Sequence, residues 1–132
     1  MKTFLKIQYL ALLVLSIINI SCRKVHTYEG KATIISRTTD LTLKDSALIY
    51  GTVCSAADES LPERFAMVWI AGTNIKTGVD SLGTFNIKLI PGTYTIKCSL
   101  WGEEKDVEQL DSLSILSNEK IQIKFLLKVI VE

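Results

Sequence analysis

The chain has few of the residues on which most catalytic and metal sites depend. Its 132 residues include one histidine, three cysteines and two prolines. The histidine, His26, precedes the patterned part of the chain, so it is not expected to serve a serine or cysteine nucleophile as general base. Zinc usually takes four nitrogen or sulfur ligands at close spacing, which His26, Cys54 and Cys98 cannot supply. We therefore expect a non-catalytic protein with no metal and no cofactor.

The sequence also lacks a surplus of charge of either sign and a long amphipathic helix. It holds 15 basic and 14 acidic residues, a formal net charge of +1. Proteins that bind nucleic acid carry a clear basic surplus, so we expect no nucleic-acid partner. No glycine-rich phosphate loop or Gly-x-Ser-x-Gly sequence occurs either, which removes two further classes of enzyme from consideration.

What the sequence does contain begins with a secretory signal. Lys2 and Lys6 precede an apolar run, Ile7–Ile20, which is followed by Ser21-Cys22. A transmembrane helix needs ~20 apolar residues, and this run is shorter and interrupted by polar residues, so a cleaved signal is favoured over a retained membrane helix. Removal of residues 1–21 leaves 111 residues, the size of one ordinary domain.

The end of this signal resembles a bacterial lipobox. Ser21 and Cys22 match the pattern, whereas Asn19 stands where leucine is commonest. The resemblance implies that Cys22 becomes the acylated first residue and anchors the protein in a membrane through its acyl chains. Arg23 and Lys24 follow, in place of the acidic residues typical of surface-exported lipoproteins. We expect a cell-envelope protein on the outer membrane, facing the periplasm.

The two remaining cysteines lie in a compartment that permits disulfides. Strand alternation points Cys98 toward the interior of the domain and Cys54 away from it. Because side chains on opposite faces are hard to bridge, two separate thiols are favoured, and a Cys54–Cys98 disulfide stays the alternative.

From Ala47 onward the apolar residues alternate with a period of two, which indicates β-strands. Residues 22–46 are expected to form a lipidated tether, polar over 23–30, with an additional strand at Lys31–Arg37 as an option. Residues 47–132 are expected to form the domain. The expected strands are Leu48–Cys54, Phe65–Gly72, Lys76–Asp80, Thr84–Leu89, Thr93–Leu100, Leu113–Leu116 and Ile121–Val131, with Glu103–Leu110 as loop or irregular strand.

Turn signals separate these segments. Asp80-Ser81-Leu82-Gly83 suits a type I turn, Pro91-Gly92 suits a type II turn, and Ser117-Asn118-Glu119 is expected to close the last hairpin. Short alternating strands with such turns are typical of a sandwich or barrel. The predicted fold is all-β, an antiparallel β-sandwich of about seven strands, preceded by a signal-peptide helix.

Several short motifs occur in an order known from one family. They are Gly51-Thr52-Val53, Leu61-Pro62, Val68–Thr73, Asp80–Phe85 and Pro91–Ile96. In this order they resemble the carboxypeptidase regulatory-like domain, a transthyretin (prealbumin)-like β-sandwich found in envelope proteins of Bacteroidetes-like bacteria. The resemblance covers roughly residues 48–130. It implies a structural or binding module without a peptidase activity of its own.

One strand carries an unusual outer face. If Val68 and Ile70 point to the core, then Phe65, Met67 and Trp69 share the other side. A contiguous exposed apolar patch of this kind marks a contact surface for a protein partner, a glycan or the membrane interface. The alternative is that the Lys31–Leu43 segment covers these residues.

A group of acidic residues could bind calcium through oxygen ligands, but a solvated loop is favoured because the EF-hand pattern is missing. The group consists of Glu103, Glu104, Asp106, Glu108 and Asp111. The predicted function is a lipid-anchored structural or binding module of the envelope. The alternative from another class is a small-ligand carrier of transthyretin type, working as a dimer around the Trp69 face.

Overall fold

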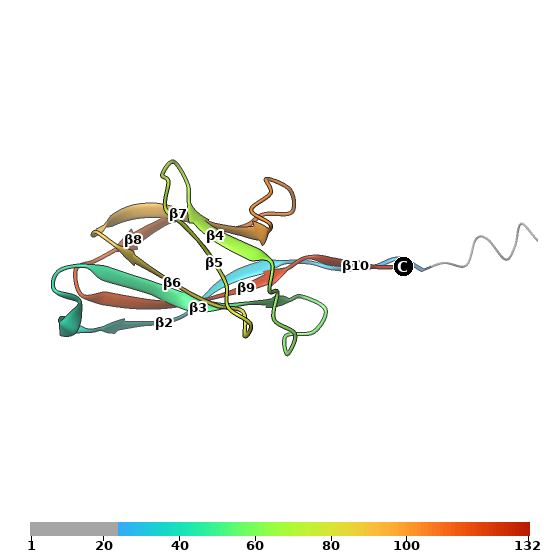
Figure 1. Cartoon of the computed structure of the whole chain (residues 1–132), viewed down its shortest axis with the longest axis horizontal. Helices are drawn as coiled ribbons and strands as arrows, with labels where there is room; N and C mark the ends of the chain where they lie inside the picture. Colours follow the sequence, from blue (N-terminus) through green and yellow to red (C-terminus); the bar gives the residue numbers. More distant parts are fainter. Residues whose placement is uncertain (1–23) are drawn as a thin grey trace, which may run out of the picture.

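The computed structural model describes residues 24–132, which consist of strands and loops with one short 3-10 helix (Figure 1). The elements are β1 (His26–Tyr28), β2 (Lys31–Thr39), η1 (Leu41–Leu43), β3 (Ala47–Ser55), β4 (Ala66–Ile70), β5 (Lys76–Gly78), β6 (Thr84–Leu89), β7 (Gly92–Leu100), β8 (Glu108–Ile115), β9 (Glu119–Leu127) and β10 (Val129–Val131). The predicted signal peptide and the predicted lipidation site, Cys22, lie outside the described residues.

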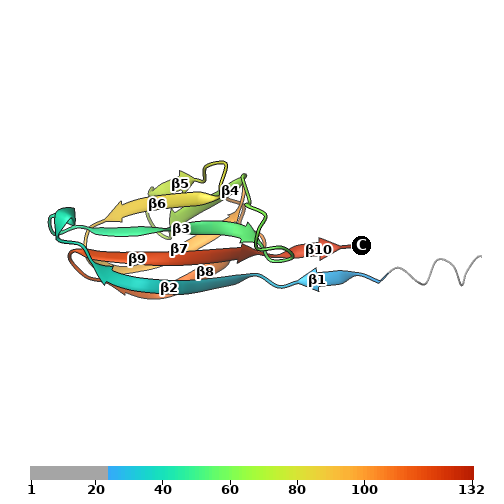
Figure 2. The same cartoon turned by 90° about the horizontal axis from the view of Figure 1, so that it is seen from below.

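Two four-stranded sheets pack face to face and enclose the core. One has the strand order β2-β9-β3-β6 and the other has the order β5-β4-β7-β8. Figures 1 and 2 show them as two layers. The predicted all-β sandwich is confirmed.

The alternation of apolar residues accounts for the core. In β9, Ile121, Ile123, Phe125 and Leu127 are buried while the residues between them are partly exposed. The rings of Phe125 and Phe85 pack against each other from β9 and β6, with centroids 5.9 Å apart. Each fully buried side chain of this size contributes about 1.5–3 kcal/mol through the area that it removes from water.

The first sheet is mixed, whereas the sequence predicted antiparallel pairing throughout. β3 pairs with β6 in antiparallel fashion and with β9 in parallel fashion, with Gly51 opposite Ile123. A Cβ atom on Gly51 would lie 1.7 Å from the backbone oxygen of Ile123, so only glycine fits this approach of the two strands. The optional strand is present as β2, which pairs with β9 along its whole length.

The expectation of a polar tether over residues 23–30 is wrong in part. His26–Tyr28 forms β1, which pairs with β10 in a two-stranded ribbon that extends from the sandwich (Figure 1). The single strand expected over Ile121–Val131 is divided at Lys128 into β9 and β10. A strand of three residues is too short to show a periodic pattern, and its partner lies at the other end of the domain. The sequence pattern therefore does not predict the β1–β10 ribbon.

The turn at Asp80 is as predicted. The amide of Gly83 donates to the carbonyl oxygen of Asp80 at 3.0 Å, and Gly83 has a φ of 75°. The Asp80 carboxylate accepts from the hydroxyl and amide of Thr84 and from the amide of Leu82. These bonds, that from the Thr84 hydroxyl above all, lower the pKa of Asp80.

The prediction for Pro91-Gly92 is wrong, and the turn at Ser117-Asn118-Glu119 is present, with the Glu119 amide donating to the Leu116 carbonyl oxygen at 3.3 Å, but it does not close a hairpin. Gly92 does not have the positive φ that a type II turn requires, and it begins β7 in extended conformation. Pro91 connects β6 to β7, which belong to different sheets, so the chain crosses the sandwich here and does not form a hairpin. Asn118 likewise lies between β8 and β9, which belong to different sheets.

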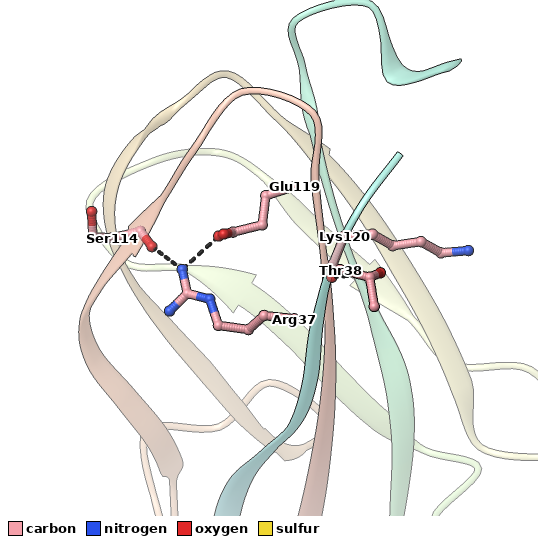
Figure 3. Close-up of polar contacts among 5 residues, drawn as sticks. All are labelled: Arg37, Thr38, Ser114, Glu119 and Lys120. Carbon is pink, nitrogen blue, oxygen red and sulfur yellow. Dashed lines mark hydrogen bonds and ion pairs between the residues drawn. The ribbon is translucent and has the colours of Figure 1, made fainter. Parts of the chain in front are cut away.

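A polar contact joins the two sheets at one end of the sandwich. The Arg37 guanidinium, on β2, donates at 2.5 Å both to the backbone oxygen of Ser114 on β8 and to the carboxylate of Glu119 on β9 (Figure 3). Thr38, next along β2, donates to the backbone oxygen of Lys120 at 3.5 Å.

Within residues 24–132 no helix has the length and apolar character that crossing a bilayer demands.

Candidate functional site

The outer face of β4 is apolar, as its alternation predicted. Val68 and Ile70 are fully buried, whereas Met67 and Trp69 point to the opposite side and are partly exposed. Phe65 lies one residue before the strand with 58% of its surface exposed. The three residues named from the sequence are therefore all outside the core.

The Lys31–Leu43 segment does not cover this face. Its strand, β2, pairs with β9 in the other sheet. The neighbours of β4 are β5 and β7, with Trp69 opposite Lys76 on one side and opposite Lys97 on the other. Among the described residues, Trp69 thus stands between two lysine-bearing strands.

A second tryptophan, which the sequence analysis did not include in this surface, completes it. Trp101 follows β7 in left-handed conformation, with a φ of 59°, and Gly102 continues in the same region with a φ of 70°. The Trp101 indole stacks on the Phe65 ring, with centroids 4.5 Å apart and planes inclined by 13°. Trp101 nevertheless remains 65% exposed.

Backbone hydrogen bonds fix this turn. The Trp101 amide donates to the carbonyl oxygen of Phe65 at 2.8 Å, and the Glu103 amide donates to that of Leu100 at 3.2 Å. The buried Ser99 hydroxyl donates to the carbonyl oxygen of Glu103 at 2.6 Å. A left-handed conformation is costly for a bulky residue, and such conformations concentrate at functional sites. The chain holds Trp101 in a strained conformation while leaving its ring exposed.

The two tryptophans line one groove. It has a volume of about 440 Å³, within the ~300–1,000 Å³ range typical of small-molecule sites. The residues that line it come from β4, from the turn before β5 and from the turn after β7; they are Met67, Trp69, Thr73, Asn74, Ile75, Lys76, Trp101, Gly102 and Glu104. Its lining combines apolar side chains with the polar side chains of Thr73, Asn74, Lys76 and Glu104.

Charges of both signs lie at the rim. The Lys97 ammonium lies 3.8 Å from the Glu104 carboxylate, and both groups are on the side of the groove formed by β7 and its following turn. Lys76 lies on β5, on the other side of Trp69. Thr73 donates through its hydroxyl to the carbonyl oxygen of Ile70 and accepts from the amide of Ile75, which fixes the turn before β5.

The cysteines and the histidine lie elsewhere. Cys54 and Cys98 are free and buried, so the disulfide alternative is wrong. Burial raises the pKa of the Cys98 thiol strongly, which keeps it protonated and unreactive. His26 is exposed on β1.

The acidic residues considered as a calcium site do not converge. Glu104 faces Lys97, and Asp106 lies 3.7 Å from the ammonium of Lys128. Glu108 begins β8, where burial and then the negative charges of Glu29 and Asp106 raise its pKa. Over residues 24–132 no three His, Cys, Asp or Glu side chains are grouped so as to hold a metal ion.

The sequence pattern predicts Phe65, Met67 and Trp69 on this surface but not Trp101. The period-two pattern reveals the outward side of β4, but the position of Trp101 depends on two successive left-handed residues and on a contact with Phe65 across the sheet. The signal available was the Trp101-Gly102 pair directly after an alternating strand.

Comparison of the chain with known protein families and with curated proteins finds no match.

Proposed function

We propose that the chain is a non-catalytic, lipid-anchored module of a bacterial cell envelope that binds its partner or ligand in the groove between Trp69 and Trp101. One observation carries the proposal. Two tryptophans, the only two in the sequence, lie on the outer side of a sheet whose inner side already fills the core. Large apolar groups placed there do not stabilise the sandwich by core packing, and a contiguous exposed apolar patch is typical of a contact surface.

A non-catalytic role suits the groups that the groove presents. Its hydroxyl, on Thr73, is engaged with the backbone at Ile70 and Ile75. Lys76 and Glu104 lie on opposite walls, and neither is hydrogen-bonded to a nucleophile. These groups suit recognition of polar ligand atoms better than proton transfer to a reacting group.

The proposed anchor is the acylated Cys22, on the outer membrane and facing the periplasm. The support is the sequence order of basic residues, apolar run and Ser21-Cys22. β1 begins at His26, so an acyl group on Cys22 would join the chain close to the β1–β10 ribbon. We further propose that the domain is of carboxypeptidase regulatory-like type. The support is the set of motifs that resemble that family and the two-sheet architecture, in which Gly51 of β3 lies against the backbone of Ile123.

The anchor is tested by metabolic labelling of the full chain with an alkyne fatty acid in a bacterium that processes lipoproteins. The wild type is expected to take up the label and to fractionate with membranes, and Cys22→Ala is expected to lose both. Arg23→Ala serves as the control that changes the neighbouring residue without removing the thiol. Labelling of the Cys22→Ala protein would contradict the anchor.

The binding role is tested by retention of the full chain on isolated envelopes. Trp69→Lys is expected to abolish a saturable retention that remains when the lipid anchor is absent, so the comparison is made in a Cys22→Ala background. Leu82→Lys, at an exposed apolar position outside the groove, is the matched control. Equal retention of the Trp69→Lys and Leu82→Lys proteins would contradict a role for the groove.

A dimeric small-ligand carrier is the second candidate, favoured by the groove's volume and by the exposed Phe65–Trp101 stack, which a second copy could bury. Sedimentation of the full chain in mild detergent distinguishes the two. The carrier requires a dimer that Trp101→Lys dissociates, and a monomer contradicts it.

A further inference from the structure

We propose that the groove binds a saccharide, with pyranose rings against Trp69 and Trp101 and ring hydroxyls at the polar rim. This inference rests on the proposed function, because it names the ligand of the same surface. It follows from three properties of the groove: rigid aromatic walls, a rim with both donors and acceptors, and a concave shape of limited size.

The aromatic walls are held in place before any ligand arrives. Phe65 stacks against one face of Trp101 at 4.5 Å, and the Trp101 amide donates to the backbone of Phe65 at 2.8 Å. Met67 lies beneath the turn, since a Cβ on Gly102 would be 3.5 Å from the Met67 side chain. A ring fixed in this way loses little conformational entropy when a ligand stacks on it.

Aromatic faces suit one side of a sugar ring. The π face of an indole is electron-rich, and the axial C–H bonds of a pyranose form an apolar, weakly electropositive face of similar size. Trp69 on β4 and Trp101 after β7 offer two such surfaces in one groove. A chain of more than one sugar unit therefore fits better than a single monosaccharide.

The rim suits the hydroxyl groups at the edges of the sugar. Each hydroxyl donates one hydrogen bond and accepts others, so a site for several hydroxyls needs donors and acceptors together. Asn74 supplies an amide with both, Lys76 supplies a donor, and Glu104 supplies an acceptor that lies 3.8 Å from the Lys97 ammonium. Asn74 and Lys76 lie at and just after the turn that precedes β5, whereas Glu104 lies in the turn after β7.

The same features disfavour other occupants. A purely apolar ligand would desolvate the Glu104 carboxylate and the Lys76 ammonium without replacing their hydrogen bonds, which costs free energy. A ligand with an apolar face and hydroxylated edges matches both parts of the groove.

The test uses the fluorescence of the chain itself, because both of its tryptophans line the groove. The full chain in mild detergent is titrated with soluble probes: cello-, malto-, xylo-, manno- and chito-oligosaccharides, oligogalacturonides and muropeptides. At least one probe is expected to change the emission saturably, with calorimetry giving the same dissociation constant. Trp69→Ala and Trp101→Ala, followed by calorimetry, are each expected to weaken binding about tenfold or more. Trp101→Phe is expected to restore part of the loss, and Leu82→Ala is the matched control with unchanged affinity.

Failure of this inference is distinguishable from failure of the proposed function. If no probe binds the folded protein but Trp69→Lys still reduces retention on envelopes, the saccharide is wrong and the binding groove stands. If a probe binds with the same affinity to both alanine variants, the saccharide site lies elsewhere and the inference is overturned. If no probe binds and retention is unchanged in Trp69→Lys, both proposals fall.

Discussion

The outer faces of the two sheets differ although both sheets pack on one core. The central strands of the β2-β9-β3-β6 sheet carry polar and basic side chains on their outer side, among them Thr52, Gln122 and Lys124. Its aromatic residue, Tyr50, has the Lys120 ammonium 4.9 Å from its ring centre. The β5-β4-β7-β8 sheet instead exposes Met67 and Trp69 and adds Trp101.

This difference separates what the fold requires from what it merely tolerates. The outward positions of β3 and β9 carry threonine, glutamine and lysine, together with Leu48 and Leu126, which are only partly exposed. A strand with one wet face needs β-forming residues there and no exposed tryptophan. A hollow of about 490 Å³ also lies over Tyr50, with Leu48 and Phe85 in its lining, but no tryptophan contributes to it. The exposed tryptophans are therefore a property of one face and not of the sandwich.

The largest effect on stability is expected in the core, which the two sheets share. Phe125→Ala removes a fully buried ring that packs on Phe85, and it is expected to lower the free energy of unfolding by about 3–5 kcal/mol. Urea unfolding followed by circular dichroism measures the loss. Leu82→Ala, at an exposed turn position, is expected to change stability by less than about 0.5 kcal/mol. A similar loss in the two variants would contradict the assigned core.

A matched pair of outward substitutions sharpens the comparison directly. Trp69→Thr gives β4 the kind of residue found on the other sheet and is expected to abolish envelope retention while the protein still unfolds cooperatively. Tyr50→Thr, on the opposite face, is expected to leave retention unchanged and to cost about 0.5–1 kcal/mol through loss of the Lys120 contact. Retention lost equally in both variants would show that the two faces do not differ in function.

A third pair isolates the strain at Trp101. Trp101→Gly and Trp101→Ala both remove the indole, but only glycine adopts a φ of 59° without penalty. The glycine variant is expected to be more stable than the alanine variant by about 1 kcal/mol. Chemical denaturation of the two proteins measures the difference, and equal stabilities would show that the turn relaxes at no cost.

The smallest effect is expected at Glu108, at the start of β8. Its folded-state pKa is raised, by burial first, so its ionisation opposes folding and stability falls as pH rises through the unfolded and folded pKa values. Glu108→Gln lacks this charge and is expected to have a slightly higher Tm than the wild type at pH 7.5, with the difference vanishing below about pH 4. A lower Tm for Glu108→Gln at pH 7.5 would contradict the sign.

The sandwich and the outward side of β4 could be predicted because both follow from a period of two in the sequence. The alternation of Phe85, Ile87 and Leu89 specifies a buried and a wet face with no knowledge of partners. The phase of β4 likewise placed Met67 and Trp69 outside the core.

The remaining features depend on contacts between distant segments. The β1–β10 ribbon pairs three residues at each end of the described chain, and nothing in His26–Tyr28 alone specifies that partner. Pro91-Gly92 has the composition of a tight turn, but the strands on either side belong to different sheets. The place of Trp101 is set by left-handed backbone geometry and by stacking on Phe65, neither of which a strand pattern encodes.

The most direct measurement is hydroxyl-radical footprinting of the two tryptophans in the native envelope and in the purified full chain. If the groove is occupied in the cell, Trp101, which is 65% exposed in the protein alone, is oxidised several-fold more slowly in the envelope, while Leu82 on its separate turn reacts equally in both samples. Equal oxidation of Trp101 in the two samples would contradict the account.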